Sequence, residues 1–262
     1  MFEKHPKELL PAILVNMFAH FAFFTLMFSF LFFLSAKFDF ITDKTGIIYS
    51  IFYVSISILM LIGGLIADKT RDYKGTISKG LILMTIGCLV IAIPSGQSWV
   101  FLTIICIALF LIAFGSALFK VNIYAMLGQM YDNPNYSHMR DSGFLLSNLF
   151  VNIGALLAPL ATIGIRNYWM LYNGLTYNSE FLNLCFRYIA NDENKNSYYF
   201  FENLAAASGQ GTMEMSEFVT QYLHVYNAGF SCIFALAVIA MVISLIIFLL
   251  NEIGRASCRE RV

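Results

Sequence analysis

The sequence predicts an all-α membrane protein with six transmembrane helices. Of its 262 residues, 59% are apolar and only 12% are charged, whereas about a quarter of the residues in soluble domains are charged. The apolar residues gather in six runs, each long enough to cross the ~30 Å hydrocarbon core of a bilayer. The formal net charge is +0 and no basic face is present, so the composition excludes a nucleic-acid-binding protein and leaves the lipid bilayer as the main partner.

Each predicted span holds about 20 predominantly apolar residues, which is the length that a transmembrane helix needs. The first span is too long for a secretory signal, and it has Pro11 in its first turn, where a proline loses no hydrogen bond. The six predicted spans are Leu10–Ser35, Gly46–Ala67, Ile77–Pro94, Trp99–Leu118, Gly143–Ile165 and Asn227–Asn251.

The distribution of Lys and Arg predicts a multi-pass protein of the plasma (inner) membrane with both termini in the cytoplasm, because cytoplasmic loops carry the excess of basic residues. The opposite side has the long segment 166–226, which holds three basic residues against six acidic ones. We therefore expect 166–226 to form an extracytoplasmic loop. The basic residues on the predicted cytoplasmic side are Lys4, Lys7, Lys69, Arg71, Lys74, Lys79 and Arg140.

The long loop is expected to form a small external cap of short amphipathic helices, for example over Tyr198–Ala207. It contains no constellation of paired acids and bases, and the spans contain none either. No C-x-x-C or Cys/His spacing typical of a metal site occurs. We therefore predict that the protein is not an enzyme and binds no metal or cofactor.

The composition changes abruptly at Glu252. Residues 252–262 carry five charges in eleven positions directly after an apolar run. Read back through the genetic code, this segment resembles the translation of a sequencing adapter, and a basic juxtamembrane tail is the alternative. We therefore take 1–251 as one six-helix bundle and 252–262 as a non-native tail, and we expect the natural chain to continue past Asn251.

The connection between the second and third spans contains packing and charge motifs. The adjacent glycines Gly63 and Gly64 allow close helix approach in a membrane, where lipid offers no hydrophobic force for packing. Asp68, Lys69 and Arg71 can form a charge cluster that breaks and reforms during gating. A merely solvated turn explains the same charges equally well.

Lys120 is the only charged residue deep enough to belong to a span rather than to a flank. Because an ammonium in hydrocarbon costs at least ~2.5–3.5 kcal/mol, we expect it to face a wet cavity or a partner. Snorkelling to the cytoplasmic edge is the alternative. Asn152 lies mid-span and is expected to point inward, with an interhelical hydrogen bond as the alternative. Asn148 lies one turn earlier on the same face.

The order of these motifs resembles the N-terminal half of a proton-dependent oligopeptide transporter (POT/PTR) of the major facilitator superfamily. The resemblance extends from the N-terminus to Asn251, and it implies that Lys120 contacts substrate or pairs with a carboxylate of the missing C-terminal half. It also implies that Asn152 contacts substrate, and it favours the gating interpretation of Asp68. The stretches that carry the resemblance are Phe2–Pro11 with Phe21, Gly63–Lys69 with Gly75, Gly115–Asn122 with Leu127–Tyr131, and Phe144 with Val151–Gly154 and Ala158–Pro159.

The first span departs from the family pattern of acid-x-x-acid-Arg before a Phe and two tyrosines, which the family uses for proton coupling and for binding the peptide carboxylate. No Asp or Glu remains deep in any span. His20 can partly substitute because an imidazole titrates near neutral pH, and a neutral histidine bonded to a neighbouring helix is the alternative. Asn16 shares its helical face. The span reads Asn16, Ala19, His20, Phe21, Ala22, Phe23 and Phe24, and Ser57 stands where the family has a second-span tyrosine.

Three functions remain open from the sequence. The first is a secondary active transporter of di- and tripeptides working by alternating access, with proton symport in question. The second is a carrier of the same fold for an uncharged or aromatic solute. The third is a non-transporting six-span membrane protein. The candidate solute-binding residues are Lys120, Asn152, Asn148, His20 and Asn16, and the candidate gating residues are Asp68, Lys69 and Arg71.

Overall fold

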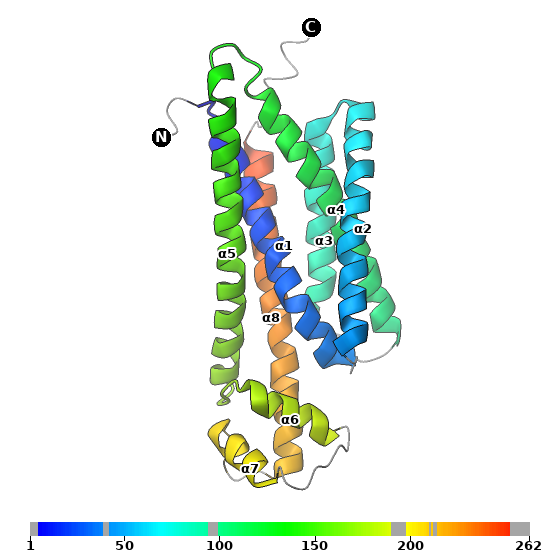
Figure 1. Ribbon diagram of the computed structural model, residues 1–262, viewed down its shortest axis with the longest axis vertical. Helices are drawn as coiled ribbons and strands as arrows, with labels where there is room; N and C mark the ends of the chain where they lie inside the picture. Colours follow the sequence, from blue (N-terminus) through cyan, green and yellow to red (C-terminus); the bar gives the residue numbers. More distant parts are fainter. Residues whose placement is uncertain are drawn as a thin grey trace.

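The protein is a bundle of long helices, as a computed structural model shows (Figure 1). The structure describes residues 5–38, 42–93, 99–189, 198–209, 211 and 214–251. Within these ranges six helices are long and apolar enough to cross a membrane, in agreement with the predicted fold class. They are α1 (Leu9–Phe38), α2 (Thr42–Thr70), α3 (Tyr73–Ala92), α4 (Trp99–Gln129), α5 (Arg140–Tyr172) and α8 (Met215–Leu250).

The six long helices form two groups of three. Helix α1 packs mainly against α5 and α8, whereas α4 packs mainly against α2 and α3, and the contact between α3 and α8 joins the groups. Exchanging α1, α2 and α3 with α4, α5 and α8 reproduces this set of neighbours. Such a repeat of three helices within a six-helix half is the architecture of major facilitator transporters.

Small residues bring the helices of the second group into close contact. A Cβ atom added at Gly80 of α3 would lie 2.7 Å from the carbonyl oxygen of Gly115 in α4. A Cβ atom added at Gly63 of α2 would lie 2.5 Å from the carbonyl oxygen of Ala117. Because van der Waals packing replaces the hydrophobic effect between membrane helices, these approaches stabilise the α2–α3–α4 group.

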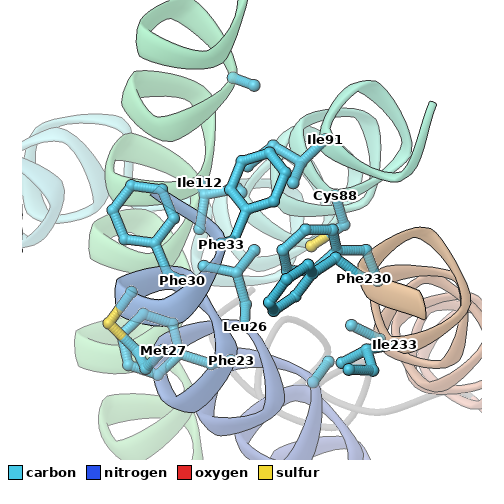
Figure 2. Packing of buried hydrophobic residues seen from close by; sticks show 14 of the residues in the cluster. Phe23, Leu26, Met27, Phe30, Phe33, Cys88, Ile91, Ile112, Phe230 and Ile233 are labelled. Carbon is cyan, nitrogen blue, oxygen red and sulfur yellow. The ribbon is translucent and has the colours of Figure 1, made fainter. Parts of the chain in front are cut away.

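The core is aromatic where α1 meets the other helices. Figure 2 shows the side chains of α1 meeting those of α3, α4 and α8 in one cluster. Phe33 of α1 lies edge-on to Phe230 and Phe234 of α8, with ring centroids 5.7 and 5.2 Å apart. Edge-to-face pairs of this kind add to the stabilisation that burial provides.

Several helices are longer than the predicted spans. Helix α5 has 33 residues and α8 has 36, which correspond to about 50 and 54 Å at 1.5 Å per residue. The segment between them is therefore 173–214, shorter than the predicted 166–226. The helices therefore continue past the predicted ends of the apolar runs at Ile165 and Asn227, through Arg166 and the tyrosines that flank these runs.

The segment between α5 and α8 folds into two short helices, α6 (Ser179–Ile189) and α7 (Tyr198–Ala207), and α7 has the predicted bounds. Figure 1 shows both at the end of the bundle where α5 ends and α8 begins. Phe181 of α6 lies edge-on to Tyr222 of α8 at 4.8 Å, and the Tyr222 hydroxyl donates to the Thr176 carbonyl at 3.1 Å. The Trp169 indole of α5 donates to the Val225 carbonyl at 3.1 Å. The predicted non-native tail, 252–262, lies outside the described residues.

Candidate solute-binding site

Lys120 lies inside a helix rather than at its end. Helix α4 continues to Gln129, nine residues beyond Lys120, although the predicted span ended at Leu118. Its ammonium lies 3.5 Å from the centroid of the Phe23 ring of α1, in a cation–π contact. Within the described residues the structure shows no carboxylate bonded to Lys120. The side chain is thus held between α1 and α4 by an aromatic ring, and no acid in the described part of the bundle neutralises its charge.

His20 lies at the same level of the α1–α4 contact. Its ring is 6.3 Å from the rings of both Phe24 and Phe119, and Phe119 directly precedes Lys120. Its Nδ1 donates to the backbone carbonyl of Asn16 at 2.9 Å, because a carbonyl oxygen only accepts. The partner in this hydrogen bond therefore belongs to α1 itself. The neutral-histidine interpretation had instead expected a partner on a neighbouring helix. Asn16 and His20 do share one buried environment.

Asn16 joins α1 to α5. Its Nδ2 donates to the Ser147 hydroxyl at 3.2 Å, and the residue is only 1% exposed. Its Oδ1 atom is buried and has no hydrogen-bond partner among the described residues. In this structure the amide connects two helices, and its contact with a solute stays a prediction.

Asn148 and Asn152 lie on the exposed face of α5. The structure shows no interhelical hydrogen bond for Asn152 within the described ranges, although such a bond was the alternative to an inward-pointing side chain. An amide on a membrane-spanning helix requires water or a polar partner. The two asparagines therefore mark a strip of α5 that is unsuited to lipid, and their role in solute binding stays a prediction.

The predicted gating residues surround the tight connection between α2 and α3. Asp68 accepts a hydrogen bond from the Tyr73 hydroxyl at 2.7 Å. Arg71 has a φ of 53°, in the left-handed region that side chains other than glycine rarely adopt. Asp72 then caps α3 by accepting from the Gly75 amide at 2.8 Å. Lys69 and Arg71 are exposed, so this turn presents two cations and its role in gating stays a prediction.

A buried polar contact near the N-terminus was not anticipated from the sequence. Nδ1 of His5 lies 2.8 Å from the Tyr131 hydroxyl, just beyond the end of α4, and both residues are buried. Burial raises the pKa of Tyr131 to about 12. The Tyr131 ring occupies the space beside Gly143 of α5, where any Cβ atom would collide with it. Both residues lie in stretches that carry the family resemblance, Phe2–Pro11 and Leu127–Tyr131, but nothing in either stretch indicates that they meet.

The fold and these polar positions define a multi-pass membrane protein with the helix arrangement of a six-helix transporter half. The model of the POT family, PTR2, matches residues 74–253, which is more than half of the chain. The chain belongs to the POT family. This assignment agrees with the sequence resemblance.

Curated relatives match a shorter stretch. The di-/tripeptide transporter of Lactococcus lactis subsp. lactis (strain IL1403) is 36% identical over 119 residues, which cover 45% of this chain and 22% of the relative. The di-/tripeptide transporter of Lactobacillus helveticus is 30% identical over 114 residues, which cover 43% and 21%. The match thus spans about a fifth of the length of these relatives.

Solved structures match nearly the whole chain. A peptide transporter POT in complex with sulfate has a TM-score of 0.64 at 19% identity, covering 97% of this chain and 39% of that one. A POT family transporter in complex with 5-aminolevulinic acid has a TM-score of 0.60 at 19% identity, covering 97% and 40%. These likenesses show the fold, and they agree with the predicted N-terminal half of a larger transporter.

Proposed function

We propose that this chain is the N-terminal half of a secondary active transporter, and that the full protein moves small peptides across the plasma (inner) membrane by alternating access. The observation that carries the proposal is Lys120, a half-buried ammonium deep in α4 that has no acidic partner in the described part of the bundle. The names of the relatives, di-/tripeptide transporters, support peptides as the solute. Two six-helix halves would expose a shared midplane site to each side in turn.

Lys120 supplies the charge that this half contributes to the site. A carboxylate, either of the solute or of the second half, would form a charge-assisted hydrogen bond with the ammonium. The Phe23 ring stabilises the cation until that partner arrives, since a ring face attracts a positive charge. Asn148 and Asn152 of α5 would add neutral donors and acceptors along the same route.

Proton coupling depends on the second half in this proposal. The acidic residues of the long helices whose side chains the structure describes are Asp68, Asp141 and Glu217, and each lies in a first or last turn. This half therefore offers no carboxylate in the middle of a described span. His20 already uses Nδ1 in a hydrogen bond within α1, which leaves its Nε2 for a solute or for a residue of the second half.

The proposed orientation places the end with the α2–α3 turn in the cytoplasm. Helix α1 begins and α8 ends at that same end of the bundle (Figure 1). Lys69, Arg71 and Arg140 lie at this end, as the positive-inside rule requires. The α6–α7 cap would then be extracytoplasmic.

The proposal is tested with the full-length protein, obtained by sequencing the gene past the codon for Asn251 and expressing the complete reading frame. Reconstituted in liposomes, it should take up a labelled di- or tripeptide, and unlabelled peptides should compete. A stop codon close behind Asn251 would contradict the transporter proposal and favour a six-span protein. Uptake of another solute with no competition by peptides would overturn peptide transport while keeping the transporter fold.

A further inference from the structure

The open face of α1 is lined by phenylalanines. Beyond Leu10 in its first turn, the exposed residues in the described part of this helix are Phe24, Phe28 and Phe32. Their exposed fractions are 36%, 40% and 48%. A spacing of four places all three on one side of the helix. We call these three residues the phenylalanine face. The polar residues of α1 whose burial the structure describes are all buried: Asn16, His20, Thr25 and Ser29. Asn16 and His20 continue the spacing of four from Phe24 towards the start of the helix.

The position of Lys120 indicates what this face meets. Phe24 lies edge-on to Phe23 at 5.8 Å, and Phe23 carries the Lys120 ammonium over its ring. Membrane-spanning lysines face a water-filled cavity or a polar partner because an ammonium in lipid is costly. The phenylalanine face thus starts one residue along α1 from the ring that carries this ammonium, which supports placing it on the side of the bundle that the solute reaches. Phe28 and Phe32 continue that side along α1, with ring centroids 6.2 Å apart.

We propose that Lys120 and the phenylalanine face form a selectivity site for solutes that join a carboxylate to an aromatic side chain on one carbon atom. In a peptide this unit is an aromatic residue at the C-terminus. The inference rests on the proposed function and deepens it, since it names the preferred peptides of the same site. Lys120 binds the carboxylate, and the side chain packs against Phe24 and Phe28.

The same arrangement makes the amino group of the solute unimportant to this half. An ammonium is recognised by a carboxylate, and the described parts of α1 and α4 carry none. A peptide with an acylated amino group should therefore keep the affinity that α1 and α4 contribute. Moving the aromatic residue to the N-terminus does cost affinity, because the ring then no longer lies next to the carboxylate that Lys120 holds.

A competition experiment with the full-length protein in liposomes tests the inference. Alanyl-phenylalanine and phenylalanyl-alanine have the same composition and charges, and they differ only in where the ring lies. We expect alanyl-phenylalanine to compete with a labelled peptide at about three- to tenfold lower concentration, the range that an aromatic pair supplies. N-acetyl-alanyl-phenylalanine should retain the advantage over N-acetyl-phenylalanyl-alanine.

Variants then locate the preference. Phe24→Leu and Phe28→Leu should reduce the ratio between the two dipeptides towards one. Phe110→Leu is the matched control, since Phe110 is an exposed phenylalanine of α4 ten positions from Lys120, and the ratio should stay unchanged. Size-exclusion profiles check that each variant folds. The ratio between the two dipeptides in the wild-type protein tests the inference even if a variant fails to fold.

Equal competition by the two dipeptides in the wild-type protein would overturn the inference while leaving peptide transport intact. So would a ratio that survives both phenylalanine substitutions. If no peptide competes but 3-phenylpropionate does, the proposed peptide function fails, and the preference for an aromatic carboxylate is supported.

Discussion

Two clusters in this bundle place a polar side chain against an aromatic ring. In one of them the polar group has a hydrogen-bond partner within the chain, and in the other it has no partner of opposite charge among the described residues. At the end where α1 begins, His5 and Tyr131 form a hydrogen bond of 2.8 Å between buried partners. Between α1 and α4, Lys120 faces the Phe23 ring at 3.5 Å and no carboxylate of the described bundle bonds to it. The first cluster is complete within this chain. The second lacks, within the described ranges, the anion that a half-buried cation inside a membrane span requires.

The difference separates a structural contact from a functional one. The buried hydrogen bond joins the segment before α1 to the residue just beyond α4, so removing it should cost stability and spare solute binding. An unneutralised cation costs stability and is retained where it serves a function. Substitutions in the His5–Tyr131 cluster should therefore lower stability and spare uptake, whereas substitution of Lys120 should lower uptake and spare or raise stability.

The largest effect is expected at Lys120. Lys120→Gln in the full-length protein should lower peptide uptake at least about 30-fold, since truncating one member of a charge pair costs several kcal/mol. Its apparent melting temperature should stay level or rise, because the substitution removes a half-buried charge that has no acidic partner in the described bundle. Lys120→Arg retains the charge and serves as the control. A normal uptake rate with Lys120→Gln would contradict the functional role of Lys120 and remove the distinction between the two clusters.

Gly143 tests the opposite cluster by steric means. A Cβ atom at this position would overlap the Tyr131 ring. Gly143→Leu should therefore displace the ring and destabilise the protein by about 1–3 kcal/mol, the usual cost of overpacking. Thermal unfolding of the purified protein measures this. Gly164→Leu, at a glycine with open space around it, is the matched control and should have little effect.

Tyr131→Phe removes only the hydroxyl and leaves His5 buried without its partner. The expected loss is about 1–2 kcal/mol of stability, the cost of an unsatisfied buried polar group. Peptide affinity of the folded protein should not change. A shift in affinity as large as the shift in stability would show that this cluster is not purely structural.

Asn16→Ala should have the smallest effect. The amide donates one hydrogen bond of 3.2 Å to Ser147, while its oxygen has no partner in the described ranges. Such bonds within membranes average about 0.6 kcal/mol, so the melting temperature should change little. Ser147→Ala is the matched control from the other side of the bond. If Asn16→Ala abolishes uptake while Ser147→Ala does not, the asparagine acts on the solute.

The sequence was sufficient to predict the helices but not which of their faces are covered. Six apolar runs, the position of α7 and the depth of Lys120 followed from composition and spacing. Apolar residues that face lipid and those that face protein have the same appearance in a sequence, so the burial of Asn16 could not be predicted. The His5–Tyr131 contact joins residues 126 positions apart, and no local pattern signals such a pair.

The end of α5 and the start of α8 lie beyond the predicted spans for another reason. Hydropathy marks where lipid ends, whereas a helix continues as long as its backbone hydrogen bonds and side-chain packing persist. Arg166 continues α5 by stacking on Tyr177, with its guanidinium carbon 3.6 Å from the ring centroid. Tyr177 in turn stacks on Tyr226 of α8, so the extended helices support the cap.

The central claim is that Lys120 binds the carboxylate of the solute. The most direct measurement compares alanyl-phenylalanine with its C-terminal amide as competitors for uptake by the full-length protein and by Lys120→Gln. The wild-type protein should discriminate strongly in favour of the free carboxylate, and the variant should treat the two ligands nearly alike. Undiminished discrimination by Lys120→Gln would contradict the claim and would assign the carboxylate to a group outside this bundle.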